Sequence, residues 1–230
     1  MWNTYNLDEQ IQHLLNHYPS LAIVETDFKQ IRLIGTISIY RSACNYTLCK
    51  DYTIELFIPI SDSELPKIKC TDNSIDVNYP HRYTNGMLCL ETDTTIKFRF
   101  IDGFNLVEWM DEYVETYFFS YEYYMRYGHF PFGERSHGFI GIVESYQDIF
   151  NETDYGKIYA LLQYSAEHSY HGHVDCPCGS GLRLRKCHGL YLYPYMTDMR
   201  KKHIIQNDYN TIRKEVLAIE SARRNSNTPK

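Results

Sequence analysis

Residues 52–60 read YTIELFIPI, and their apolar side chains alternate along the chain at Ile54, Leu56 and Ile58. A period of two is typical of a β-strand with one face against a core, because successive side chains of a strand point to opposite faces. This stretch therefore predicts a half-buried strand.

Two similar apolar runs precede this strand, at residues 21–28 and 31–40. The polar connection between them, residues 27–30, favours a hairpin, because a parallel crossover needs about a dozen residues. Residues 67–70 can add a short edge strand. The sequence predicts an antiparallel meander.

Helical periodicity lies on both sides of the meander. Apolar side chains recur at helical spacing over residues 5–18, 106–127, 149–168 and 199–224. Residues 79–95 have no period and contain proline and glycine, which is typical of an irregular loop that carries a site. Together these elements predict the α+β fold class.

Composition limits the class of the protein. The chain has 230 residues, 43% of them hydrophobic, enough for one medium domain with a smaller element beside it. No apolar run reaches the roughly 18 residues of a membrane span, and the N-terminus lacks the pattern of an export signal. We therefore expect no membrane span and a cytoplasmic location, where the seven cysteines stay reduced or bind metal.

Charge is divided unevenly along the chain. Residues 176–230 hold 11 Lys and Arg against 4 Asp and Glu, a balance of +7, whereas residues 1–175 hold 12 against 25, a balance of −13. We interpret the basic segment first as a solvated face, because no aromatic-interleaved RNA motif accompanies it. Weak, non-specific binding of nucleic acid is the alternative.

Residues 176–188 read CPCGSGLRLRKCH and contain four soft metal ligands, Cys176, Cys178, Cys187 and His188. Zn²⁺ takes four such ligands in a tetrahedron, and the glycines let the backbone turn back. A closed Cys₃His set has no open coordination position, so we expect a structural zinc ion. The segment resembles the SEC-C motif, a short zinc element, and the resemblance implies a docking element for proteins or anionic surfaces.

Residues 79–90 read YPHRYTNGMLCL and contain one cysteine, Cys89. The order of a helix, antiparallel strands, a loop with one cysteine and further helices resembles the ubiquitin-conjugating enzymes over roughly residues 1–120. That family has a His-Pro-Asn element eight to ten residues before the cysteine, a glycine three residues before it and a leucine after it. Tyr79-Pro80-His81, Gly86 and Leu90 stand at these positions.

This resemblance implies a ubiquitin-conjugating-like fold that forms a thioester through Cys89 and transfers a ubiquitin-like modifier, or links itself to a partner protein. The implied partners are the modifier, an acceptor protein and an activating enzyme, and in bacteria such proteins are expected in small conjugation or antiphage defence systems. His81 stands where the family has asparagine, so it either stabilises the oxyanion or favours the Cys89 thiolate.

A non-catalytic alternative stays open. Free cysteines are usually buried, so Cys89 can be a small core residue in an interaction module that uses the same fold and docks through the zinc element. Cys44, Cys49 and Cys70 have no comparable sequence context, and we assign them structural roles.

Residues 133–138 read GERSHG and place a glutamate, a serine and a histidine close together. Members of a catalytic triad normally come from distant parts of a chain, so a hydrolase is disfavoured. We expect Glu134 to pair with Arg135 and His137 to bond to the backbone, or the segment to form a wall of the Cys89 site.

These patterns divide the chain into three segments. A ubiquitin-conjugating-like domain with a helical extension is expected over residues 1–172, a zinc knuckle over residues 173–190 and a basic helical tail over residues 191–230.

The charge distribution makes a prediction about nucleic acid. Any binding by the basic segment should be weak, independent of base sequence and steeply salt-dependent, because it rests on phosphate contacts alone. Titration of labelled DNA at several salt concentrations checks this. Binding that persists at high salt, or that prefers one base sequence, would contradict it.

Overall fold

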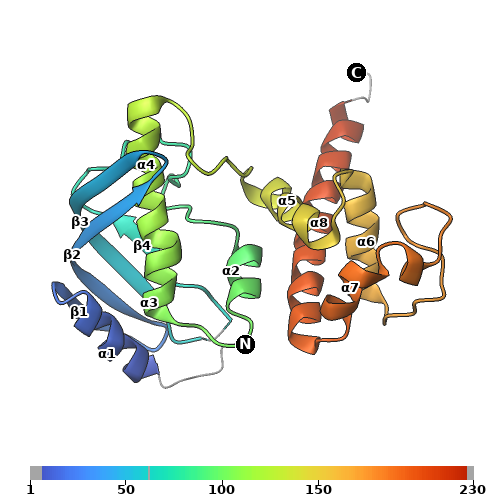
Figure 1. The fold of residues 1–230 in the computed structure, drawn as a ribbon, viewed down its shortest axis with the longest axis horizontal. Coiled ribbons are helices and arrows are strands. Elements are labelled where there is room, and N and C mark those ends of the chain that lie inside the picture. Colours follow the sequence, from blue (N-terminus) through green and yellow to red (C-terminus); the bar gives the residue numbers. More distant parts are fainter. Residues whose placement is uncertain (1–6, 62, 227–230) are drawn as a thin grey trace. The chain divides into compact units, whose positions relative to one another are not determined.

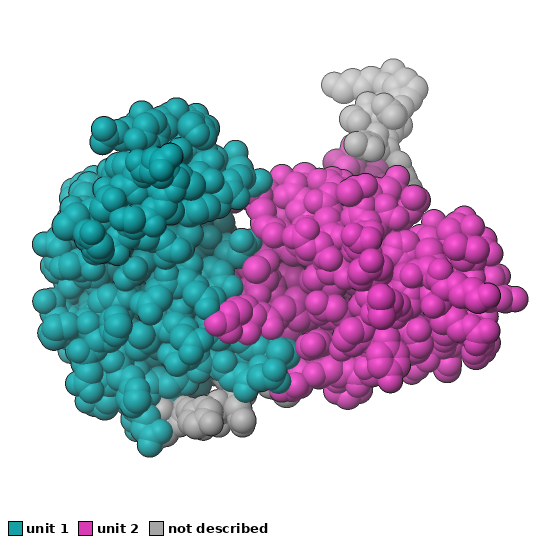
Figure 2. Space-filling view, in the orientation of Figure 1, with its two compact units in different colours: residues 1–91, 100–134 teal, residues 92–99, 135–230 magenta. Residues whose placement is uncertain are grey.

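The computed structural model describes residues 7–61 and 63–226 (Figure 1). The chain forms two compact units: unit 1 contains residues 1–91 and 100–134, and unit 2 contains residues 92–99 and 135–230 (Figure 2). Unit 1 combines a sheet with helices, and the described elements of unit 2 are helical, which confirms the α+β class. Within the described ranges, no helix is both long enough and apolar enough to cross a membrane.

Unit 1 is built on a four-stranded antiparallel sheet in the order β1-β2-β3-β4, which confirms the predicted meander. The strands are β1 (Leu21–Thr26), β2 (Gln30–Ala43), β3 (Tyr46–Pro59) and β4 (Lys67–Cys70).

The β2–β3 hairpin is longer than the sequence predicts, with 14 residues in each strand. Ala43 pairs with Tyr46, and the two residues between them, Cys44 and Asn45, have φ angles of 49° and 58°. Two consecutive residues with positive φ are the mark of a type I′ turn, whose twist matches that of paired strands. Because cysteine is not a usual residue for this turn, the sequence alone does not indicate it.

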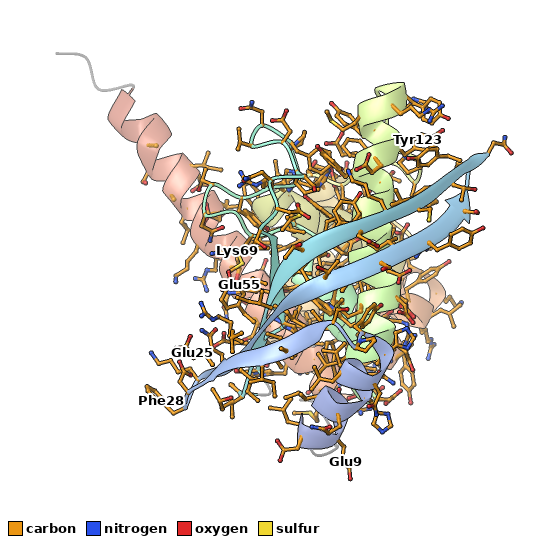
Figure 3. The ribbon with its side chains drawn as sticks, turned by 90° about the vertical axis from the view of Figure 1, so that its left-hand side faces the viewer. Glu9, Glu25, Phe28, Glu55, Lys69 and Tyr123 are labelled. Carbon is orange, nitrogen blue, oxygen red and sulfur yellow. The ribbon has the colours of Figure 1, made fainter. Side chains whose placement is uncertain are left out.

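One face of the sheet packs against helices. Ile37, Ile54 and Leu56 are almost wholly buried, and Tyr52 stacks on Phe118 of α4 with ring centroids 4.1 Å apart. Figure 3 shows the α3–α4 helices behind the strands. Burial of large apolar side chains of this kind stabilises a fold by about 1.5–3 kcal/mol each, so this face forms the core of unit 1.

The helices of unit 1 are α1 (Leu7–His17), α3 (Leu106–Trp109), a π-helical turn (Met110–Val114) and α4 (Glu115–Tyr127). Asn105 caps α3 by accepting hydrogen bonds from two backbone N–H groups, and Gly128, with a φ of 75°, ends α4. The structure therefore confirms a helical stretch over residues 106–127. Of the helix predicted over residues 5–18, residues 5 and 6 lie outside the described part of the chain.

Unit 2 contains α2 (Asp93–Arg99), α5 (Gly138–Phe150), α6 (Tyr155–Glu167), a 3₁₀ turn (Leu184–Lys186), α7 (Gly189–Met196) and α8 (Met199–Ser226). The basic helix predicted over residues 199–224 is confirmed as α8. The single helix predicted over residues 149–168 is wrong, because Asn151 adopts a left-handed conformation and ends α5, while Asp154 caps a new helix, α6. The sequence prediction missed α5 and α2.

The division into units differs from the boundary expected at residue 172. Helices α5 and α6 share one apolar core with the cysteine segment and α8, through buried side chains that include Tyr146, Leu161, Leu184 and Ile205. The segment around residues 173–190 is thus part of a larger helical unit.

Helix α2 is anchored in unit 2 by a half-buried carboxylate. The hydroxyls of Thr94 and Tyr146 both donate to Oδ2 of Asp208, each at 2.8 Å. Burial raises the pKa of Asp208 to about 6, although the two hydroxyl donors oppose this rise.

This raised pKa predicts a pH-dependent effect of Asp208→Asn. A carboxyl whose folded pKa lies above its unfolded value favours folding below about pH 4, and that contribution is lost as the pH rises through about 6. The stability of the variant relative to the parent should therefore rise between pH 4 and 7, by up to about 3 kcal/mol. Denaturant unfolding of both proteins across this range measures the difference, and a difference that does not change with pH would contradict the assignment.

Candidate functional site

The four metal-ligand candidates predicted from the sequence converge in unit 2. Their ligand atoms, three Sγ and one histidine nitrogen, all lie within 4.8 Å of one another, in a group that could hold a metal ion. Cys176 Sγ and Cys187 Sγ lie 3.4 and 3.2 Å from Nδ1 of His188, and Cys178 Sγ lies 3.6 Å from Cys187 Sγ.

These separations fit a tetrahedral metal site. With metal–sulfur bonds of about 2.3 Å and metal–nitrogen bonds of about 2.0–2.1 Å, a tetrahedron has edges of about 3.8 Å between sulfurs and about 3.6 Å between sulfur and nitrogen. The three separations given above are within about 0.4 Å of these values. The donors are thus close to coordinating positions, and Nδ1 is the histidine atom that faces the thiols.

The backbone that holds the donors is a tight loop. Cys176 N–H donates to the carbonyl of Leu182 at 2.8 Å, and Gly179 N–H donates to the carbonyl of Cys176 at 3.1 Å. Gly179 and Gly181 have φ angles of 76° and 74°, a region that glycine enters without strain. This geometry explains the glycines of the motif.

A carboxylate lies behind the histidine. Oε2 of Glu152 is 3.7 Å from Nε2 of His188, on the side of the ring opposite the thiols. Metal-bound histidines commonly have a carboxylate partner on the second ring nitrogen, and this partner fixes the orientation of the ring. Glu152 precedes His188 by 36 residues, so no local sequence pattern indicates this contact.

Burial and hydrogen bonding set the protonation of these donors in opposite directions. Burial raises the pKa of Cys176 to about 12. At Cys178 burial also acts to raise the pKa, but hydrogen bonds, the strongest of them from the Ser180 hydroxyl, outweigh it and lower the pKa. Burial lowers the pKa of His188, although the nearby Glu152 carboxylate acts to raise it. The lowered pKa favours the neutral imidazole, which is the form that binds metals.

Cys89 lies in unit 1, on a small hairpin beside β4. Its N–H donates to the carbonyl of His81 at 2.8 Å, Tyr83 N–H donates to the carbonyl of Met87 at 2.9 Å, and Gly86 closes the turn with a φ of 83°. Leu88 N–H donates to the carbonyl of Ile68 in β4. The loop that the sequence predicts as irregular is thus tied to the edge of the sheet.

Cys89 is partly exposed, and an aromatic hydroxyl lies against its thiol. The hydroxyl of Tyr83 donates to Cys89 Sγ at 3.3 Å. The sequence prediction missed Tyr83, although its position six residues before Cys89, with Gly86 between them, is compatible with a hairpin.

His81 is close to Cys89 through both its backbone and its side chain, because a nitrogen of its ring lies within 4.8 Å of Cys89 Sγ. Its Nε2 lies 3.6 Å from Oε1 of Glu134, and its ring packs edge-on against Phe130 with centroids 5.0 Å apart. Glu134 therefore lies beside the Cys89 loop. This position is the one expected if the segment 133–138 forms a wall of the Cys89 site.

The rest of the segment has other contacts. Arg135 pairs with Asp148 at 3.2 Å, and the hydroxyl of Ser136 donates to Glu144 at 2.8 Å, next to the start of α5. Ser136 thus acts as a local anchor of α5.

The remaining cysteines differ from Cys89. Cys44 forms the β2–β3 turn and Cys49 is exposed on β3. The thiol of Cys70 donates to Asp72 at 3.1 Å, and burial, together with this carboxylate, raises the pKa of Cys70 to about 12.

Comparison of the chain with protein-family models, curated proteins and solved structures gave no match. The arguments on function therefore rest on the residues and their geometry.

The cluster predicts about one bound metal ion per chain. Cys178→Ser and Cys187→Ser should each lose it, because three donors bind far less tightly than four, while Cys49→Ser, at an exposed strand position, should keep it. Glu152→Gln should retain the metal but weaken its binding by about 10- to 100-fold. Elemental analysis and competition with a chelator measure both effects. Unchanged metal content in the two cluster variants would contradict the assignment.

Proposed function

We propose that the chain is a cysteine acyl transferase of the ubiquitin-conjugating type, which carries a ubiquitin-like modifier on Cys89. One observation carries the proposal: Cys89 is a partly exposed residue on a hairpin that backbone hydrogen bonds hold beside the edge strand β4. A cysteine that must receive an acyl group and then pass it to an amine needs this access.

The reaction has two steps. The Cys89 thiolate attacks the carbonyl carbon of an activated modifier C-terminus, a thioester forms and the activating group leaves, which requires an activating enzyme. The amine of the acceptor then attacks the thioester, loses a proton, forms an amide and releases the thiolate. His81, whose Nε2 faces Glu134, serves either as a donor to the oxyanion or as the group that favours the thiolate.

The metal centre has a structural role in this proposal, and the metal is Zn²⁺. Three thiols and an imidazole in a tetrahedron form a closed ligand set that suits zinc. Cys176 is buried in the same apolar core as Leu184 and Leu192, so metal binding and the folding of unit 2 are coupled.

An interaction module without catalysis is the second candidate. Leu182, Leu190 and Tyr193, in and next to the cysteine segment, have exposed side chains, with exposed fractions of 51%, 78% and 55%. Exposed apolar side chains beside Arg185 and Lys186 favour protein docking, which would use the fold and the metal centre without chemistry at Cys89.

Brief alkylation ranks the thiols and tests the catalytic proposal. Outside the metal cluster, Cys89 should react faster than Cys70, because burial and Asp72 favour the protonated thiol of Cys70. It should also react faster than the exposed Cys44 and Cys49, for which we propose no group that favours the thiolate. Peptide mass spectrometry after short exposure to iodoacetamide gives the order. Protection of Cys89 while Cys44 or Cys49 is labelled would leave only the interaction module.

The two roles of His81 are separated by His81→Asn. Asparagine can donate a hydrogen bond but cannot carry a proton at neutral pH, so transfer survives if His81 is an oxyanion donor and falls if its charge activates Cys89.

A further inference from the structure

The hairpin geometry brings one aromatic side chain to the sulfur of Cys89. Arg82 and Leu88 are a bridged pair, so His81 lies opposite Cys89 and Tyr83 lies opposite Met87. Residues 81, 83, 87 and 89 therefore share one face of the hairpin, and Tyr83 is the diagonal neighbour of Cys89. A diagonal pair is within reach of a long aromatic side chain, which explains the 3.3 Å contact between the hydroxyl and Sγ.

The direction of this hydrogen bond matters for the chemistry. The sulfur of Cys89 accepts a hydrogen bond from the hydroxyl of Tyr83, whereas the thiol of Cys70 donates one to Asp72. A donor directed at sulfur favours the thiolate, and a carboxylate that accepts from the thiol favours the protonated form. The two thiols thus differ in the direction of their hydrogen bonds, and burial with the Asp72 carboxylate raises the pKa of Cys70.

A second tyrosine supports a polar function at this place. Tyr117 of α4 is only 5% exposed, and within the described part of the chain its hydroxyl has no hydrogen-bond partner. Its ring packs edge-on against Tyr79 with centroids 5.8 Å apart, and burial raises the pKa of Tyr117, with smaller electrostatic contributions from Tyr79, Cys89 and Cys70. A buried hydroxyl left without a hydrogen bond is costly, so Tyr117 is an unsatisfied polar group in the core next to Tyr79.

We propose that Tyr83 is a positioning residue for Cys89, which donates a hydrogen bond that favours the thiolate and directs the sulfur toward an incoming acyl group. This inference rests on the proposed function, because it assigns Tyr83 a part in the same thioester chemistry. Since 51% of the side chain of Tyr83 is exposed, its removal should not disturb the core.

The test is the pH profile of Cys89 alkylation in the full-length chain. Iodoacetamide rates at Cys89 are measured by peptide mass spectrometry from pH 6 to 10 in the parent, in Tyr83→Phe and in the control Tyr40→Phe, which changes a 73% exposed tyrosine of β2. Loss of one hydrogen bond to the thiolate should raise the midpoint of the profile by about one pH unit. The rate at pH 7 should then fall only about threefold, because a more basic thiolate is also more nucleophilic.

The outcomes separate this inference from the proposed function. A raised midpoint in Tyr83→Phe, with the parent midpoint in Tyr40→Phe, supports the role of Tyr83. An unchanged midpoint in Tyr83→Phe overturns it, even if Cys89 still forms a thioester. The proposed function fails by a different result, the absence of any thioester on Cys89, whatever the profile of Tyr83→Phe.

Discussion

The register of the β2–β3 hairpin is the constraint on which unit 1 depends. The turn at Cys44 and Asn45 fixes which residues face each other over 14 positions, and a slip by one residue would move every buried side chain to the outer face. Because β4 pairs with the second half of β3, and the Cys89 hairpin bonds to Ile68 of β4, the place of Cys89 follows from the same register. The candidate site is therefore held by a rigid sheet, as a precise chemical site requires.

Unit 2 depends on a different constraint, the convergence of three thiols and one imidazole. Three thiolates whose sulfurs all lie within 4.8 Å of one another would repel, which disfavours the ionisation of all three in the absence of a cation. The group could hold a metal ion, which would offset this repulsion and join the loop before Cys187 to the start of α7, while Glu152 lies on the far side of the His188 ring. The cysteines thus fall into two settings: in unit 2 three of them converge with His188 in a group that could hold a metal ion, and in unit 1 Cys89 lies partly exposed on the hairpin beside β4.

Local patterns in the sequence predicted what local physics determines. Alternating apolar residues gave the strands, and the dense Cys/Gly segment gave the four metal ligands. The length of the β2–β3 hairpin was underestimated because its turn uses Cys44, a residue type that rarely adopts positive φ. The contacts of Glu152 with His188, of Glu134 with His81 and of Thr94 with Asp208 join residues distant in sequence, so a single sequence without an evolutionary record carries no sign of them. Apolar residues at helical spacing on both sides of Asn151 favoured one continuous helix, so the sequence did not indicate the break between α5 and α6.

The central claim is that Cys89 carries an acyl group, and intact-mass analysis tests it directly. The protein is produced together with the products of the neighbouring genes, purified without reductant and measured before and after neutral hydroxylamine, which cleaves thioesters but leaves disulfides intact. The account predicts a covalent adduct of the modifier mass that hydroxylamine removes and that Cys89→Ala does not form, while Cys49→Ala forms it as the parent does. An adduct that persists in Cys89→Ala, or a parent protein that acquires none in the presence of the modifier and its activating enzyme, would contradict the account.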